Sequence, residues 1–277
     1  MFVLSPSLLS SWFPPRTKDT HKGLFGHVGI LGGDEGMPGA LRLCGEAAAR
    51  VGSGLVSVFT RKEHLMGMVW ARPEIMCHEV TFPVKPLLKR ITVLAIGPGL
   101  GQKQWGQDLF HEMMKECNAM KIPYVLDADA LNLLAQHPQK NPHWILTPHP
   151  QEAARLLQCS AEEVQENRES AVEKIQKQYG GVCVLKGADT LICDGKEPVT
   201  LCPFGNPGMS SGGMGDVLTG VIAGLLAQGL SPYQAASLGA MIHGLAADDA
   251  AREEGERGLL ALDLMPRLRR WVNGACG

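Results

Sequence analysis

The chain has 277 residues, of which 45% are hydrophobic and 19% charged, and its formal net charge at pH 7 is −2. This composition is typical of a soluble globular protein, and the length fits one large α/β domain or two small ones. The small net charge gives no electrostatic basis for binding nucleic acid or an anionic membrane surface, so we expect neither as a partner.

The first residues, MFVLSPSLLSSWFPPR, are apolar but lack a basic region, so we expect no signal peptide. The longest apolar run, VLTGVIAGLLAQGL, is shorter than the roughly 20 residues of a transmembrane helix. Eight cysteines are scattered without a C-x-x-C pair, which predicts a cytoplasmic protein with reduced thiols and neither a zinc site nor disulfides. No linker or repeat is evident, so we expect one domain over 1–277, with 1–20 as an N-terminal extension.

Short runs of aliphatic and β-branched residues alternate with helical patterns along the chain. The predicted strands are 27–33, 54–60, 92–99, 123–130, 143–150 and 181–190. The predicted helices include 38–51, 105–118, 150–158 and 161–179. Continuous Val/Ile/Leu runs are typical of strands buried on both faces, and their alternation with helices predicts an α/β fold with a doubly wound, mostly parallel sheet and helices on both faces. The later segment TLICDGKEPVTLC, with its Asp194-Gly195 turn, predicts an antiparallel hairpin.

Polar or glycine-rich clusters follow four of the predicted strands. GPGLG follows VLAI, DADA follows YVL, TPHP follows WIL, and KGADT follows VCVL. In an open parallel sheet the carboxyl ends of the strands share one edge, and ligands bind along that edge. The four clusters therefore predict one binding site.

Asp216 is the first candidate for chemistry, in the stretch GNPGMSSGGMGDVLTGVIAGLLAQG. Apolar residues recur after it at helical spacing, and Gly229 fits the position that follows a helix end. Glycines 212, 213 and 215 leave N–H groups at the helix start open to an anion, and an Asp beside that anion could take a proton from a hydroxyl. An Asp that merely caps the helix is the alternative.

Three other clusters each allow a functional and a structural interpretation. Lys186 could contact phosphate and Thr190 could bind a nucleotide, or the pair could belong to a turn with a solvated lysine. His149 lies in a rigid Pro-His-Pro turn and either contacts a ligand or caps helix 150–158. Asp127 and Asp129 could hold a ligand or Mg²⁺ through water, or cap the following helix. No cluster has the spacing of direct metal ligands, so any metal is expected to arrive with a nucleotide.

Familiar nucleotide and hydrolase motifs are absent from the sequence. It contains no G-x-x-x-x-G-K-[ST], GPGLG is not G-x-G-x-x-G, and there is no G-x-S-x-G. With its motifs assembled, the chain instead resembles the ADP/ATP-dependent NAD(P)H-hydrate dehydratases of the ribokinase-like superfamily, from about His21 to Asp263. Seven segments in order carry the resemblance: HKGLFGHVGILGG, GALRLCGEAAARVGSGLV, AIGPGLG, YVLDADALNLL, ILTPHPQEAARLL, VLKGADTLI and the glycine-rich stretch around Asp216.

The resemblance implies a set of site residues. Hydrated nicotinamide would be bound by Ala40, Gly99, Gly101, His149 and Asp216. The AMP moiety of the nucleotide would be bound by Lys186, Gly187, Ala188, Asp189, Thr190 and Gly215. Asp216 would be the catalytic base, ADP or ATP would donate the phosphoryl group with Mg²⁺, and single-domain bacterial members favour ADP. The family also suggests a homotetramer.

The implied activity is dehydration of the S epimer of NAD(P)H hydrate, by phosphorylation of the ring hydroxyl and elimination of phosphate, which makes the enzyme a lyase with a kinase fold. Some family members carry an epimerase domain ahead of this region. Because only about 20 residues precede it here, we expect no epimerase activity from this chain. The alternatives are a vitamin-alcohol kinase of the same superfamily, which would release a stable phosphorylated product, and a non-catalytic nucleotide-binding regulator, which would not need Asp216.

Overall fold

A computed structural model of the chain describes residues 1–13 and 15–274, and its strands form one ten-stranded sheet. The order across the sheet is β1-β10-β9-β8-β7-β6-β5-β2-β3-β4. The strands are β1 (Phe2–Val3), β2 (His27–Leu31), β3 (Leu55–Thr60), β4 (Met76–Glu79), β5 (Val93–Ile96), β6 (Tyr124–Leu126), β7 (Trp144–Leu146), β8 (Val182–Leu185), β9 (Thr190–Cys193) and β10 (Thr200–Cys202). From β8 across to β4 every neighbouring pair is parallel, so the predicted α/β class and mostly parallel sheet are confirmed.

The predicted hairpin is also confirmed. β9 is antiparallel to both β8 and β10, with Thr190 opposite Cys202. Asp194 forms the turn, since its Oδ1 accepts hydrogen bonds from the N–H groups of Lys196 and Glu197. Gly195 follows at φ +72°, a conformation that a glycine adopts without steric cost.

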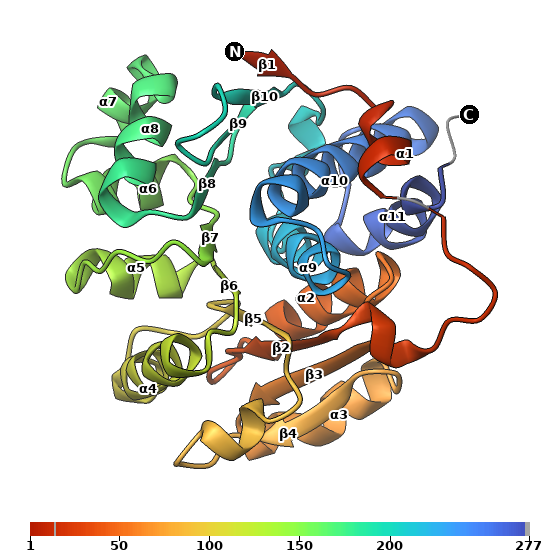
Figure 1. Cartoon of the computed structure of the whole chain (residues 1–277), viewed down its shortest axis with the longest axis vertical. Helices are drawn as coiled ribbons and strands as arrows, with labels where there is room; N and C mark the ends of the chain where they lie inside the picture. The colour runs from red at the N-terminus through yellow and green to blue at the C-terminus, as the bar shows by residue number, and fades with distance from the viewer. Residues whose placement is uncertain (14, 275–277) are drawn as a thin grey trace.

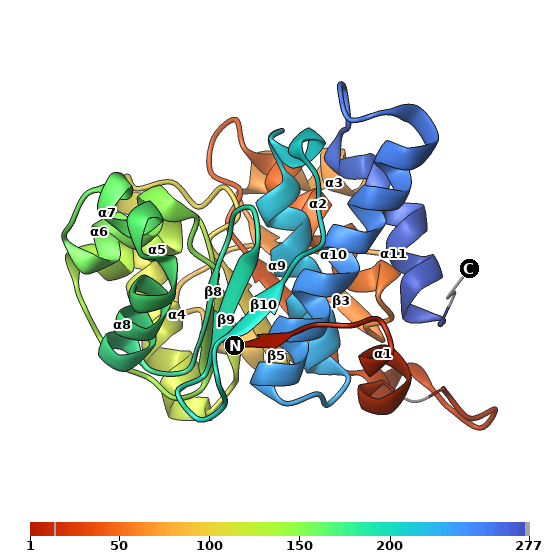
Figure 2. The ribbon, with the colours of Figure 1, turned by 90° about the horizontal axis from the view of Figure 1, so that it is seen from above.

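Helices cover both faces of the sheet, as Figures 1 and 2 show from two directions. One layer contains α4 (Gln104–Met120), α5 (Asp129–Gln136), α6 (Pro150–Leu157), α7 (Ala161–Glu166) and α8 (Arg168–Tyr179). On the other side lie α1 (Leu8–Trp12), α2 (Pro38–Arg50), α3 (Leu65–Ala71), α9 (Met214–Ala227), α10 (Pro232–Glu254) and α11 (Leu264–Val272). Each layer buries its own apolar cluster against the sheet, as expected for strands that are apolar on both faces.

The predicted helices agree with α2, α4 and α6, but the prediction of one helix over 161–179 is wrong. The chain breaks at Asn167, which leaves helical geometry and accepts a hydrogen bond from Ser170 N to cap α8. The predicted strands 92–99 and 123–130 are too long, because β5 and β6 end at Ile96 and Leu126 and give way to loops.

Two further features of the sequence, its apolar helices and its cysteines, can be compared with the structure. Within the described part of the chain, no helix is long and apolar enough to cross a membrane. Seven cysteines are unpaired in the described residues, and Cys276 lies outside them.

Candidate functional site

The carboxyl ends of the parallel strands bring the predicted clusters to one edge of the sheet. Gly99 and Gly101 follow β5, Asp127 follows β6, His149 follows β7, and Lys186 follows β8. These strands are consecutive neighbours in the sheet, so the prediction of one shared edge is confirmed. The edge therefore places these groups in one row.

The start of α9 faces this row without a side-chain cap. Gly213 occupies the capping position at φ +91°, and its side-chain-free backbone leaves the first-turn N–H groups without a side-chain partner. L side chains rarely adopt this φ, and an added Cβ at Gly213 would lie 2.4 Å from Leu43 Cδ1, so any other residue would be strained there. Asp216 is the third helical residue, and the alternative in which it caps the helix is wrong.

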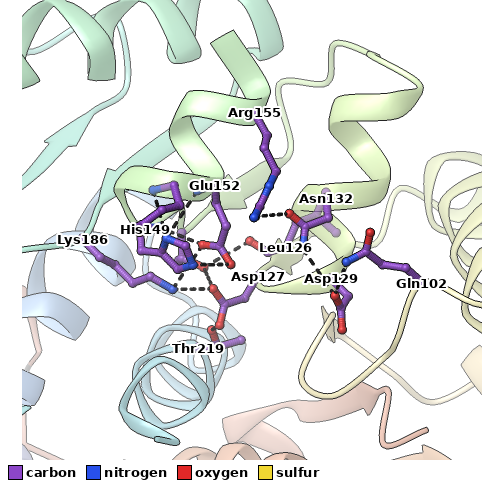
Figure 3. A network of polar contacts seen from close by, with 12 residues as sticks. Gln102, Leu126, Asp127, Asp129, Asn132, His149, Glu152, Arg155, Lys186 and Thr219 are labelled. Carbon is purple, nitrogen blue, oxygen red and sulfur yellow. Dashed lines mark hydrogen bonds and ion pairs between the residues drawn. The ribbon is translucent and has the colours of Figure 1, made fainter. Parts of the chain in front are cut away.

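A buried ion pair lies directly under this helix start (Figure 3). Lys186 Nζ donates a hydrogen bond of 2.7 Å to Asp127 Oδ1, and the Asp127 residue is 1% exposed. An added Cβ at Gly215 would lie 3.2 Å from Lys186 Nζ and 3.5 Å from Asp127 Oδ2. The first turn of α9 therefore packs on the ion pair, and a glycine keeps the approach close.

Two hydroxyl groups complete the contacts of Asp127. Thr147 Oγ1 donates to Oδ1 at 2.9 Å, and Thr219 Oγ1 donates to Oδ2 at 2.9 Å. Burial alone would raise the pKa of Asp127, but the charge and hydrogen bond of Lys186, with the two hydroxyls, lower it below its ordinary value. Asp127 is thus an ionised, buried anchor for Lys186 and two hydroxyls, and α5 begins without a side-chain cap.

Lys186 itself is held by two carboxylates. Its side chain is 18% exposed, and Nζ lies 3.8 Å from Glu152 Oε2 in addition to its bond with Asp127. Burial opposes the charge of Lys186, but the two carboxylates outweigh burial and raise its pKa. The alternative of a solvated lysine in an ordinary turn is therefore wrong.

Two further carboxyl groups have pKa values near neutrality. Burial, and then the charge of Asp127, raise the pKa of Asp216 to about 7, against the opposing effect of Lys186. Burial raises the pKa of Glu152 to about 7 as well. Groups that titrate near pH 7 are suited to exchange protons in catalysis. Among the described residues, no hydrogen bond occupies the carboxylate of Asp216, whereas Glu152 Oε2 accepts one from His149 N at 2.8 Å.

His149 caps α6, as one of its two interpretations predicts. Its Nδ1 accepts hydrogen bonds from Gln151 N and Glu152 N, and Nε2 lies 3.3 Å from Glu152 Oε1. Burial, together with the charge of Lys186, lowers the pKa of His149, so a neutral ring that donates from Nε2 explains both contacts. The side chain remains 41% exposed, so capping leaves part of the ring open to a ligand.

The other residues expected at the hydrate site lie together. An added Cβ at Gly99 would lie 3.3 Å from Ala40 Cβ, and Gly99 and Gly101 have φ values of +59° and +71°. Gly101 N donates to Asp129 Oδ2 at 2.9 Å, so Asp129 positions this loop. His149 follows β7, two strands away from β5, so a ligand that contacts both His149 and this group would extend past the position of Asp127.

The loop after β8 is exposed, and the side chain of Arg168 holds it in place. Gly187, Ala188 and Asp189 are all exposed, and Asp189 has φ +57°. Arg168 Nη2 donates to the carbonyl oxygens of Leu185 and Asp189, each at 3.2 Å. An added Cβ at Gly187 would lie 2.4 Å from Arg168 Nη1, so a larger residue would displace the guanidinium that holds the loop. The loop thus presents its backbone to solvent in a fixed shape.

The sequence interpretation missed four residues of this network: Thr147, Glu152, Arg168 and Thr219. Thr219 had a visible signal, because it is an isolated polar residue in the apolar run from Val217 to Leu226. Glu152 also had one, since it lies three residues after His149 at the spacing of a capping box. Thr147 and Arg168 contact their partners across 20 and 17 residues of sequence, so local patterns contain no signal for them.

Thr219→Val is expected to destabilise the fold, because it leaves an oxygen of a buried carboxylate without its donor. Losing a hydrogen bond to a charged group costs about 1.5–3 kcal/mol of unfolding free energy. Urea denaturation would measure this loss. The loss of unfolding free energy in Thr219→Val should become smaller at low pH. The reason is that the hydroxyl stabilises the ionised form of Asp127, whose folded pKa lies below its ordinary value and which becomes protonated as the pH falls.

Thr200→Val is the matched control for this variant. Thr200 is 0% exposed like Thr219, but its hydroxyl contacts neutral groups, Tyr233 Oη and Pro198 O. We expect a smaller loss that does not depend on pH in the acidic range. Equal, pH-independent losses in both variants would show that Asp127 does not depend on Thr219.

Comparisons with known proteins identify the superfamily and the family to which this fold belongs. The sheet order and the glycine-flanked start of α9 at its carboxyl edge define a ribokinase-like α/β protein. The NAD(P)H-hydrate dehydratase family model matches residues 28–270, and the chain belongs to that family.

Individual relatives agree with this assignment. The chain is 54% identical over 262 residues to a Bifunctional NAD(P)H-hydrate repair enzyme Nnr from Coxiella burnetii, covering 94% of this chain and 53% of that protein. It is 38% identical to an ADP-dependent (S)-NAD(P)H-hydrate dehydratase from Neisseria meningitidis, covering 94% and 89%. A crystal structure of the ADP/ATP-dependent NAD(P)H-hydrate dehydratase from Bacillus subtilis, co-crystallised with ATP/Mg²⁺, superposes with a TM-score of 0.87 at 30% identity, covering 98% and 97%. The chain spans about half the length of the first curated relatives it matches.

Proposed function

We propose that the chain dehydrates the S epimer of NAD(P)H hydrate to NAD(P)H, with ADP or ATP as phosphoryl donor. The observation that carries the proposal is Asp216, whose pKa is about 7 and whose carboxylate lies in the uncapped first turn of α9. The names of the Neisseria and Bacillus relatives support the substrate and the donor.

The proposed reaction replaces hydroxide, a poor leaving group, with phosphate, a good one. Asp216 takes the proton of the ring hydroxyl as its oxygen attacks the terminal phosphorus of the nucleotide, and the N–H groups at the start of α9 stabilise the transferred phosphoryl group. The lone pair of the ring nitrogen then expels phosphate, and loss of a proton from the neighbouring ring carbon restores the dihydropyridine. The net result is loss of water from the hydrate and hydrolysis of one phosphoanhydride bond.

We assign the two ligands to the two ends of the row. The hydrated ring would lie against Ala40, Gly99, Gly101, His149 and Asp216. The AMP moiety would lie against Lys186, Gly187, Ala188, Asp189, Thr190 and Gly215. The exposed backbone of the loop after β8 supports the nucleotide assignment, and the adjacency of Gly99 and Ala40, where a Cβ added to Gly99 would lie 3.3 Å from Ala40 Cβ, supports their grouping at the other end.

The donor set fits a magnesium ion that arrives with the nucleotide. In the described residues, no group of three or more His, Cys, Asp or Glu side chains has the geometry of a metal site. Asp127 and Glu152 offer carboxylate oxygens, which Mg²⁺ prefers, but both are engaged with Lys186, so they would hold the ion through its water molecules. Mg²⁺ would neutralise charge on the phosphates.

One assay tests the proposed function. Hydrated NADH or NADPH is incubated with the protein and ADP or ATP, and nicotinamide absorbance is followed. Recovery of the reduced-nicotinamide spectrum, with release of phosphate, supports the proposal. Accumulation of a stable phosphorylated product would instead indicate a kinase, and nucleotide binding without turnover would indicate a regulator.

We further propose that the protein is a homotetramer and is cytoplasmic. Light scattering would test the oligomeric state, and cell fractionation would test the localisation.

Ala40→Leu is expected to raise KM for the hydrate and to leave the affinity for ADP unchanged. Ala40 is half-buried in the first turn of α2 beside Gly99, so the larger side chain would fill the space we assign to the ring. Steady-state kinetics and nucleotide titration measure the two effects. Ala49→Leu is the matched control, because Ala49 is half-buried in the same helix but lines a cavity away from this edge. Equal weakening of both ligands by Ala40→Leu would contradict the assignment.

A further inference from the structure

Arg61 lies at the same edge of the sheet and has no role in the chemistry described so far. It is the first residue after β3, and its side chain is 26% exposed. Its Nε donates a hydrogen bond of 2.5 Å to Asp34 Oδ1. Its Cζ lies 4.5 Å from the centroid of the Trp105 ring, so the guanidinium stacks on that ring. One edge and one face of the guanidinium are therefore fixed.

Asp34 is itself tied to the loop that we assign to the hydrate. Its N–H donates to Gly99 O at 2.6 Å, and its side chain is 4% exposed. An added Cβ at Gly101 would lie 2.7 Å from Asp34 Oδ2. Arg61 is thus positioned, through Asp34, relative to Gly99 and Gly101.

The remaining donors of Arg61 are open. A guanidinium carries five N–H donors, and only Nε is used here. Within residues 1–13 and 15–274, neither Nη atom has a hydrogen-bond partner, and neither is a buried unsatisfied atom. The charge of Arg61 is balanced by Asp34, and Lys103 Nζ lies 3.9 Å from Oε2 of Glu35, the residue after Asp34. A ligand would therefore be recognised by directed hydrogen bonds from the two free Nη groups of Arg61, and not by a broad positive electrostatic potential.

The location of Arg61 selects which ligand it can reach. Along the sheet β3 is three strands from β6, which at a spacing of about 4.8 Å puts Arg61 about 14 Å from the Asp127 position. The loop after β8 is five strands away, or about 24 Å. Arg61 is therefore on the hydrate side, beyond the ring and opposite the nucleotide loop.

We propose that Arg61, pre-positioned by Asp34 and Trp105, binds a phosphate group of the dinucleotide hydrate. This inference rests on the proposed function. A fixed guanidinium fork matches two oxygens of a phosphate, which a flexible ammonium cannot do equally well. In both hydrates a diphosphate bridge follows the ribose that bears the hydrated ring, and NADPH hydrate alone carries a further 2′-phosphate, on its adenosine ribose. Arg61 would then set substrate affinity without touching the reacting atoms.

Arg61→Lys and Arg61→Gln test this role. Kinetics would be measured with NADH hydrate and with NADPH hydrate at saturating ADP. Both variants should raise KM for the hydrate about tenfold or more, the equivalent of one hydrogen bond to a charged group, with kcat within about threefold and KM for ADP unchanged. Arg61→Lys keeps a charge for Asp34, so it tests the fork in a folded protein. Lys62→Gln is the matched control, since Lys62 is an exposed cation at the next position.

The two phosphates give different outcomes. Weakening of both hydrates assigns Arg61 to the diphosphate, and weakening of NADPH hydrate alone assigns it to the 2′-phosphate. Unchanged KM values for both hydrates, with only a lower Tm, would overturn the proposal and leave Arg61 as a structural link between the loops that follow β2 and β3. Calorimetric titration of unhydrated NADPH and NADH into wild type and variants repeats the comparison without turnover. If wild type fails to turn over the hydrate, the proposed function fails, whereas this titration still decides whether Arg61 binds phosphate.

Discussion

Asp216→Asn is expected to abolish regeneration of NAD(P)H from its hydrate while the protein remains folded and still binds nucleotide. Loss of a general base lowers the rate by about 10²–10⁴-fold. Asparagine keeps the shape of the side chain at the third position of α9 but has no basic oxygen. Single-turnover measurements with hydrate and ADP would give the rate, and calorimetry would give the nucleotide affinity.

Asp263→Asn provides a matched control for this variant. Asp263 also lies at a helix start, where its Oδ2 accepts a hydrogen bond from Leu260 N, but it is outside the row of site residues. We expect its turnover to be unchanged. If Asp216→Asn keeps turnover within a few-fold of wild type, Asp216 is not the base, and Glu152, whose pKa is also about 7, becomes the next candidate.

The pH dependence of turnover and of stability should both report Asp216. A base must be deprotonated, so kcat/KM should rise with pH through about 7 and then level off. The folded pKa lies above the ordinary value of 3.8, so this group's contribution to stability is present below about pH 4 and is lost as pH rises through about 7. Asp216→Asn removes that dependence, and urea denaturation at about pH 5 and about pH 8 would show a smaller difference for the variant than for wild type.

The sequence predicts the position of this site better than its contacts. The rule that parallel strands share one ligand-binding edge correctly brought Gly99, Asp127, His149 and Lys186 together, because strand type and order depend on apolar runs that are visible in the sequence. The limits of the strands were less predictable. The predicted strand 123–130 included the two aspartates that follow Leu126, but the chain turns there, with Ala128 at φ +48°, and α5 begins at Asp129.

The state of Lys186 shows why contacts were not predictable. A lysine at a strand end is usually solvated, and the sequence offers no local sign that Asp127, 59 residues earlier, lies 2.7 Å away. Arg61 is a similar case, because its contact with Asp34 spans 27 residues of sequence. The helix α10 (Pro232–Glu254) was not predicted although Ser231 and Gln234 form a capping box, since its apolar residues surround the helix instead of forming one stripe.

Lys186→Met is expected to destabilise the protein strongly and to weaken binding of ADP. Removing one partner of a buried ion pair costs about 3–5 kcal/mol of unfolding free energy, because the remaining charge is buried without compensation. Here the unpaired charge would be that of Asp127, whose side chain is 2% exposed. Lys85→Met is the matched control, since Lys85 is 65% exposed and its pairing with Glu116 at 3.7 Å should contribute at most about 1 kcal/mol.

The double variant Lys186→Met/Asp127→Asn separates the structural role of the lysine from its role in binding. Without the carboxylate no buried charge is left at position 127, and Thr147 and Thr219 can still bond the amide, so most of the lost stability should return. The affinity for ADP should stay low, because no ammonium group is left to meet phosphate oxygens. If the double variant binds ADP as tightly as wild type, Lys186 serves only the ion pair. If the single variant already does so, the assignment of Lys186 to the nucleotide site is wrong.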